Sequence, residues 1–258
     1  MSVTSPSAVP LKPSSIWPHQ RIAWHWRHDP KRELWLAWWA MVVFYQLFSL
    51  VFFVLTRTQP PAKPWWEPPR IEQWFADNHT GLLVGFGIMF VVTGMVASQN
   101  ALNAYSMRRM SVSRAYAYSY LVLISLSALP GMLLMCVALS VGAMRPERDP
   151  ALINWLYDLG FLSYVGTMGV FLIASAVWMV AILLDTNGVL PKWFAYLNLC
   201  NALTEVVVSP AWVFKRGPFA WDGVIAWWID MVVFGIYACA SFIVLRQMIQ
   251  REDFDDRS

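Results

Sequence analysis

The chain has 258 residues, of which 58% carry hydrophobic side chains and only 14% are charged, with a formal net charge of +3. This composition and its long uncharged runs exclude an ordinary soluble domain and predict an all-α, polytopic membrane protein. The excess positive charge lies in the segments between the apolar runs. Attraction to anionic lipid headgroups accounts for it there, and we expect no nucleic-acid partner.

The N-terminal part of the chain precedes the first apolar run. Residues 1–15 are rich in Ser and Pro and lack an apolar core, which predicts a disordered cytoplasmic tail. Residues 16–34 mix three Trp residues with basic side chains, which favours a segment lying on the membrane surface. His25 and His28 have the spacing of metal ligands, but no Cys lies near them, so we predict interfacial anchoring and no metal site.

A helix needs about 20 apolar residues to cross the hydrocarbon core of a bilayer. Six stretches meet this requirement, and together they predict a transmembrane domain over 35–247, followed by a cytoplasmic tail over 248–258. The fifth stretch is the most polar, and five spans remain if it does not cross. The predicted spans are 35–55, 81–100, 117–143, 156–184, 191–213 and 221–245.

Basic residues in short loops collect on the cytoplasmic side of a membrane. In the six-helix interpretation, twelve Lys and Arg residues lie on the side of the termini and seven on the other side, so we expect both termini in the cytoplasm. The first set is Lys12, Arg21, Arg27, Lys31, Arg32, Arg108, Arg109, Arg114, Lys192, Arg246, Arg251 and Arg257; the second is Arg57, Lys63, Arg70, Arg145, Arg148, Lys215 and Arg216.

The predicted external loop over 56–80 begins with closely spaced Pro and Trp residues and is therefore stiff. Its second half predicts a short amphipathic helix, and the loop is either a lid or an interfacial anchor. Within the spans, Gly85, Gly87 and Gly94, and likewise Gly160, Gly166 and Gly169, predict faces of close helix packing. Pro130 and Gly131 predict a kink in the third span.

Two carboxylates lie deep in otherwise apolar spans, at a depth where no Lys or Arg occurs. Ionisable groups at such depth are costly, which makes Glu205 and Asp230 the first candidates for a functional site. Both lie roughly 12–14 Å from the external ends of neighbouring antiparallel helices at 1.5 Å per residue, so we expect them to face one another. Asn198 and Asn201 share the helical face of Glu205, while Tyr164 and Gln46 lie at comparable depth and complete the predicted ligand-binding or proton-coupling site.

Three uses fit this arrangement: a proton-coupled step, recognition of a hydroxyl or amine on an apolar ligand, or acid–base catalysis. Neutral hydrogen bonds between helices are the structural alternative. The sequence lacks a His-rich metal box, a nucleophile elbow, a phosphate loop and a CxxC pair, so we predict no catalytic residue, no cofactor and no metal ligand.

Three segments carry a resemblance to a known family: Arg145 to Asp149 with Asp158-Leu-Gly after it, Leu190 to Asn198, and Lys215 to Gly223. They resemble an uncharacterised family of bacterial integral membrane proteins, found in actinobacteria and proteobacteria that degrade steroids or hydrocarbons. The resemblance covers roughly residues 60–248. It implies six helices in a bacterial inner membrane and assigns no activity.

Together these observations predict an inner-membrane protein that binds or helps to move a small, mostly apolar molecule, such as a steroid, hydrocarbon or lipid-like compound. Two alternatives remain open. One is an accessory subunit that docks a membrane protein partner, and the other is an intramembrane enzyme that uses Glu205 and Asp230 as acid and base. The expected partners are the lipid bilayer, an apolar small molecule and a membrane protein.

Overall fold

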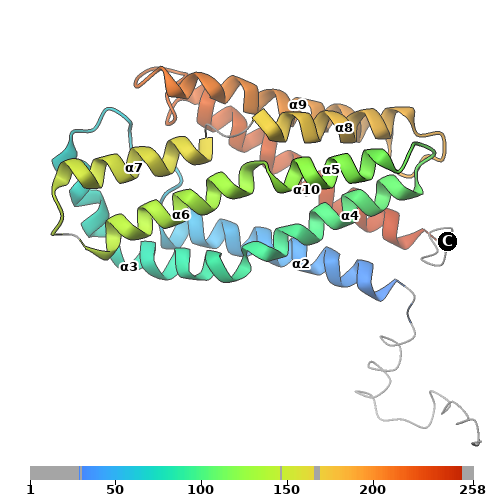
Figure 1. Ribbon diagram of the computed structural model, residues 1–258, viewed down its shortest axis with the longest axis horizontal. Coiled ribbons are helices and arrows are strands. Elements are labelled where there is room, and N and C mark those ends of the chain that lie inside the picture. Colours follow the sequence, from blue (N-terminus) through green and yellow to red (C-terminus); the bar gives the residue numbers. More distant parts are fainter. Residues whose placement is uncertain (1–28, 30, 146, 166–168, 252–258) are drawn as a thin grey trace, which may run out of the picture.

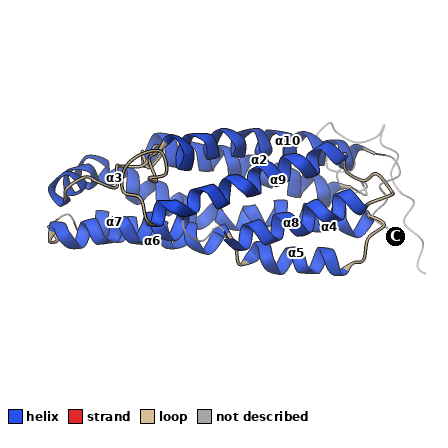
Figure 2. Cartoon of the chain, turned by 90° about the horizontal axis from the view of Figure 1, so that it is seen from above, coloured by secondary structure: helices blue, strands red, loops and turns tan. Residues whose placement is uncertain are grey.

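The computed structural model describes residues 29–251 except 30, 146 and 166–168. The described residues form helices and connecting loops without a strand, which confirms the all-α prediction. The helices run along one common axis and form an elongated bundle (Figures 1 and 2). The predicted surface segment up to residue 28, with His25 and His28, and most of the C-terminal tail lie outside the described residues.

The described helices group into six rods, each made of one or more helical pieces. The first three are α2 with the π-helical η2, then α3, η3 and α4, then α5 with α6. The last three are α7 with α8, α9 with η4, and η5 with α10. Their bounds are α2 Arg32–Ser49, η2 Leu50–Leu55, α3 Pro68–Val92, η3 Thr93–Met95, α4 Val96–Arg109, α5 Ala115–Ser125, α6 Ala128–Met144, α7 Pro150–Val165, α8 Gly169–Leu184, α9 Lys192–Val208, η4 Ser209–Trp212, η5 Val224–Ile229 and α10 Asp230–Gln250.

The six rods close into a ring in the order of the chain. Each rod packs against the next one, through α2 on α4, α3 on α6, α4 on α5, α6 on α7, α5 on α8, α8 on α9 and α9 on α10. The ring closes because α10 also packs against α2, and at the distal end α3 packs directly against α7 across it. Short connections favour antiparallel neighbours, and a closed ring of such neighbours encloses a central axis.

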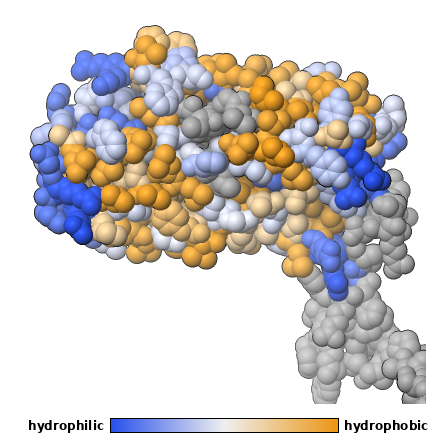
Figure 3. Space-filling view, in the orientation of Figure 1, coloured by the Kyte–Doolittle hydropathy of each residue, from blue (hydrophilic) through white to orange (hydrophobic). Residues whose placement is uncertain are grey.

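Four of the rods are long and apolar enough to cross a membrane: Arg32–Leu55, Pro68–Arg109, Ala115–Met144 and Val224–Gln250. Phe171–Leu184 is a shorter apolar helix, and α9 is interrupted by polar residues. On the face shown in Figure 3, hydrophobic residues cover the middle of the bundle, while hydrophilic residues gather at its two ends. This distribution is typical of helices that span a bilayer.

Several helix boundaries differ from the predicted ones. α10 continues to Gln250, past the predicted end of the transmembrane domain, because Met248 and Ile249 are fully buried. The predicted short helix in the 56–80 loop is instead the first part of α3, which begins at Pro68. Its Ile71 and Phe75 are buried in the bundle, so this segment extends the second rod toward its outer end.

The predicted kink in the third span lies slightly earlier than Pro130. α5 ends at Ser125, and α6 begins at Ala128 after a bend at Ser127. Pro130 therefore lies in the first turn of α6, where its missing N–H costs no hydrogen bond. A proline interrupts a helix upstream of its own position, since its ring clashes with the preceding turn.

Glycine packing follows the prediction only in part. Gly85 contacts the first rod so closely that a Cβ atom would lie 2.6 Å from Cγ2 of Thr56, and Gly160 is in ordinary contact with Leu139. Gly87 and Gly94 have open space around them, so their predicted packing role is wrong. Glycine composition alone does not show which side of a helix meets a neighbour.

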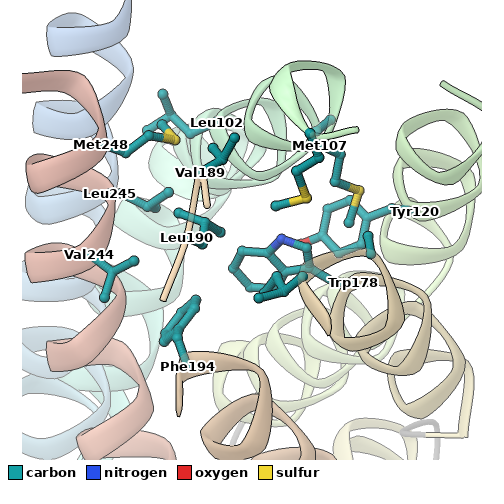
Figure 4. Packing of buried hydrophobic residues seen from close by; sticks show 14 of the residues in the cluster. Leu102, Met107, Tyr120, Trp178, Val189, Leu190, Phe194, Val244, Leu245 and Met248 are labelled. Atoms are coloured by element: carbon teal, nitrogen blue, oxygen red, sulfur yellow. The ribbon is translucent and has the colours of Figure 1, made fainter. Parts of the chain in front are cut away.

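Buried apolar residues form two clusters along the bundle axis. The proximal core lies at the end that carries Arg251, and it brings together the rings of Tyr120, Trp178 and Phe194 with Leu245 and Met248 of α10 (Figure 4). The distal core lies at the other end. Its buried residues include Phe52, Ile71, Phe75, Phe161 and Trp221.

A hydrogen-bonded turn over 185–189 ties the loops at the proximal end. The Asp185 side chain, 4% exposed, accepts hydrogen bonds from the backbone N–H groups of Ser111, Asn187 and Val189 at 2.8–3.0 Å, and one from the Ser111 hydroxyl at 3.3 Å. Arg251 donates to the carbonyl oxygens of Gly188 and Val189. These contacts hold the second, fourth and sixth rods together at one end.

A single carbonyl group joins three segments at the distal end. The oxygen of Ala62 accepts hydrogen bonds from the hydroxyl of Tyr157 and the indole N–H of Trp221, both at 2.9 Å. The first loop is thereby fixed to α7 and to the turn before η5. Specific contacts therefore close both ends of the ring. A binding site is accordingly expected between the proximal and the distal core.

Candidate functional site

A cavity of about 150 Å³ lies where the proximal and distal cores meet. All six rods contribute to its wall. Most of the lining side chains are apolar or aromatic, and the polar ones include Gln99, Tyr164, Glu205 and Asp230. A mostly apolar cavity with a few polar groups is the usual form of a small-molecule site.

The two candidate carboxylates line this cavity from neighbouring rods. Glu205 comes from the last turns of α9, and Asp230 is the first residue of α10, directly after the π-helical η5. Their side chains are only 6% and 8% exposed. Oε2 of Glu205 and Oδ1 of Asp230 have no hydrogen-bond partner within the described part of the chain. Each carboxyl group therefore keeps an unused acceptor in a buried position.

The predicted polar stripe of α9 is buried, but only Glu205 reaches the cavity. Asn198 is fully buried and donates a hydrogen bond from Nδ2 to the carbonyl oxygen of Ser175 at 2.7 Å, which joins α9 to α8. Asn201 is also fully buried, and neither its Oδ1 nor its Nδ2 has a partner among the described residues. The two asparagines thus lie on the interior side of α9 away from the cavity lining.

Of the two remaining predicted residues, Tyr164 lines the cavity and Gln46 does not. Gln46 is exposed on the outer side of α2, whereas its neighbour Tyr45 reaches the cavity and donates a hydrogen bond to Oε1 of Gln99 at 2.7 Å. Consecutive helical residues point about 100° apart, so only one of this pair can face inward.

Sequence reasoning missed several polar groups of the wall. Gln99 and Asn100 line the cavity from α4, and Tyr120 and Tyr237 line it from α5 and α10. The polar run Ser98-Gln99-Asn100 in the last third of a 42-residue apolar rod was a usable signal, since such residues face the interior of a bundle. The tyrosines gave no signal, because aromatic residues are frequent throughout this chain.

The charge of the cavity is one-sided. Among the residues that the structure describes, no lining residue is Lys, Arg or His, so none of them provides a positive charge to the wall. Within the described ranges, no group of three or more His, Cys, Asp or Glu side chains is arranged to hold a metal ion. Ionised carboxylates are costly at low dielectric, and they gain from a proton or from a bound cation.

Comparisons of the chain with protein-family models, with curated proteins and with solved structures found no match.

Proposed function

We propose that the protein binds, or helps to move, a small and mostly apolar molecule in its central cavity, with Glu205 and Asp230 as the polar anchor. The supporting observation is that both carboxyl groups line one cavity and that each has an acceptor oxygen without a partner in the described structure. Buried polar atoms are otherwise hydrogen-bonded in folded proteins, so unused acceptors beside a cavity favour a ligand that donates to them.

The size of the cavity narrows the class of ligand. Its volume of about 150 Å³ equals that of an engineered apolar cavity that binds benzene, and it lies below the roughly 300–1,000 Å³ of sites for drug-sized molecules. A compact molecule with about ten non-hydrogen atoms or fewer fits this space. A steroid fits only if the surrounding rods move apart, so compact ligands are favoured over the larger members of the predicted class.

We further propose that all six rods span a bacterial inner membrane and that both termini are cytoplasmic. The bias of twelve basic residues against seven supports this orientation. The hydrogen bonds that join the 185–189 turn to Ser111 and Arg251 support one common side for these loops and the C-terminal end. A cysteine introduced at Ser258 is then protected from membrane-impermeant thiol reagents in intact cells, after Cys200 and Cys239 are replaced by Ser. Labelling of that cysteine from outside would contradict the topology.

The binding function is tested with protein reconstituted in lipid nanodiscs and titrated calorimetrically with cyclohexanol and cyclohexylamine. Titrations of empty nanodiscs are subtracted, because both compounds enter lipid. We expect saturable binding of at least one of them. No saturable heat from either compound beyond that of the empty nanodiscs would reject the proposed function.

Replacing either of two alanines by leucine tests whether the ligand binds in the cavity. Ala226 lines the cavity and is 3% exposed, so Ala226→Leu fills part of the space and should weaken binding at least tenfold. Ala97 is exposed on α4, and Ala97→Leu is the matched control with no expected effect. Equal binding by the wild type and both variants would place the ligand outside the cavity.

A further inference from the structure

The balance of charge at the cavity indicates what kind of molecule completes it. Glu205 and Asp230 lie on neighbouring rods, both more than nine-tenths buried, and the described residues of the wall supply no cationic side chain. A bound cation therefore neutralises a carboxylate that otherwise requires a proton. The attraction between opposite charges is large in such a position, because little water screens it.

The rest of the wall favours an organic cation over a metal ion. Hard inorganic cations bind six or more oxygen ligands. Here the oxygen of Gln99 already accepts a hydrogen bond from Tyr45, and most of the remaining wall is carbon. An ammonium group with a compact apolar body matches both parts of the surface, since its charge meets the carboxylates and its body meets the apolar side chains.

Aromatic rings are the main component of that apolar surface. Nine of the lining residues are Phe, Tyr or Trp, and they come from four of the six rods. The face of an aromatic ring attracts a cation, and the attraction is stronger at desolvated sites. Many of these rings are partly or fully buried, as Tyr120, Trp227 and Tyr237 are, so the attraction acts in a largely dry environment.

The unused acceptors then specify the type of amine. Oε2 of Glu205 and Oδ1 of Asp230 can each accept a hydrogen bond from an N–H group, which a quaternary ammonium does not have. We propose that the cavity binds a protonated primary or secondary amine that carries a compact apolar group. This inference rests on the proposed function of ligand binding and names the class of ligand. One positive charge balances one carboxylate, and the second carboxyl group remains as a hydrogen-bonding partner.

The experiment compares three cyclohexane derivatives on the wild-type protein in nanodiscs near neutral pH: cyclohexylamine, cyclohexanol and cyclohexyltrimethylammonium. We expect cyclohexylamine to bind at least tenfold more tightly than cyclohexanol and the quaternary compound. Equal or tighter binding of cyclohexanol overturns the inference and leaves the proposed function intact. Equal binding of the quaternary compound overturns the role of the N–H groups, and an absence of all binding overturns both proposals.

Variants assign the preference to the two carboxyl groups. Glu205→Gln and Asp230→Asn should each weaken the binding of cyclohexylamine at least tenfold and leave that of cyclohexanol within about twofold. Asp158→Asn is the control, since Asp158 is only partly buried on α7 and does not line the cavity. An unchanged preference for the amine in both cavity variants contradicts the inference. The comparison of ligands on the wild type stands even if a variant fails to fold.

Discussion

Buried carboxylates occur in two regions of the molecule, the proximal end and the central cavity. The two regions differ in how many hydrogen bonds these carboxylates accept. Asp185 at the proximal end is 4% exposed and accepts four hydrogen bonds, three of them from backbone N–H groups. Glu205 and Asp230 are nearly as buried, at 6% and 8%, yet each leaves one oxygen without a partner in the described structure. The exposed fractions of the three side chains are similar, and their hydrogen-bond partners differ.

This difference separates a structural carboxylate from a candidate site. Burial raises the pKa of Asp185, but the backbone N–H groups of Ser111, Val189 and Asn187 lower it further, so the net shift is below the usual value. The ionised form therefore stabilises the fold at this turn. In the cavity the desolvation cost of the carboxylates is not offset by comparable contacts, which is the pattern of a group kept for binding.

The largest effect is expected from Asp185→Ala. Three backbone N–H groups then lose their acceptor, and at about 1 kcal/mol each the free energy of unfolding falls by about 3 kcal/mol. The measurement is reversible unfolding of the purified protein in mixed detergent micelles. Asp77→Ala, at an exposed position of α3, is the control, with an expected change below about 0.5 kcal/mol. If Asp185→Ala lowers the free energy of unfolding no more than Asp77→Ala does, the hydrogen bonds of Asp185 contribute little to stability.

Acidification should reduce the difference between the wild type and Asp185→Ala. The pKa of Asp185 is lower in the folded protein than its reference value of about 3.9, so its contribution is complete above about pH 4 and is lost as the pH falls through the folded value. Unfolding of both proteins is compared at pH 7 and pH 3. A stability difference that does not change between these pH values would show that the negative charge is not what the backbone groups stabilise.

Glu205→Gln and Asp230→Asn test whether the cavity carboxylates, unlike Asp185, contribute little to the stability of the fold. Each change removes an ionisable group whose burial is poorly compensated, so we expect the free energy of unfolding to stay within about 1 kcal/mol of the wild type or to rise. The same unfolding assay applies. A loss as large as that of Asp185→Ala in either variant would place the carboxyl group among the structural contacts and remove the contrast between the two regions.

The sequence predicted the all-α fold and the general positions of the helical rods, because runs of apolar residues are a strong signal. It also singled out Glu205 and Asp230, since their depth follows from the rise per residue. The rotation of a helix about its own axis is not encoded so directly. Hydropathy does not separate Tyr45 from Gln46, and it does not separate Gly85, which packs, from Gly87, which does not.

The kink and the start of α3 were misplaced for a related reason. Pro130 acts on the turn before it, and the buried Ile71 becomes recognisable as helix core only when the neighbouring rods are in place. The cavity itself depends on how the two cores meet. Such a void is a property of the packed ring, so the sequence indicated the two carboxylates without showing which other side chains form the wall around them.

The smallest expected effect concerns two asparagines one turn apart on α9. Asn198 and Asn201 are both fully buried, but only Asn198 donates a hydrogen bond, to the carbonyl oxygen of Ser175. Asn198→Leu should therefore lower the free energy of unfolding by about 1 kcal/mol, while Asn201→Leu, which loses no partner among the described residues, should be neutral or slightly stabilising. If Asn201→Leu is the more costly change, or if it weakens amine binding tenfold, Asn201 has a partner in the working protein. The binding site would then include Asn201 as well as Glu205 on α9. Asn198 would remain the structural residue of this helix face.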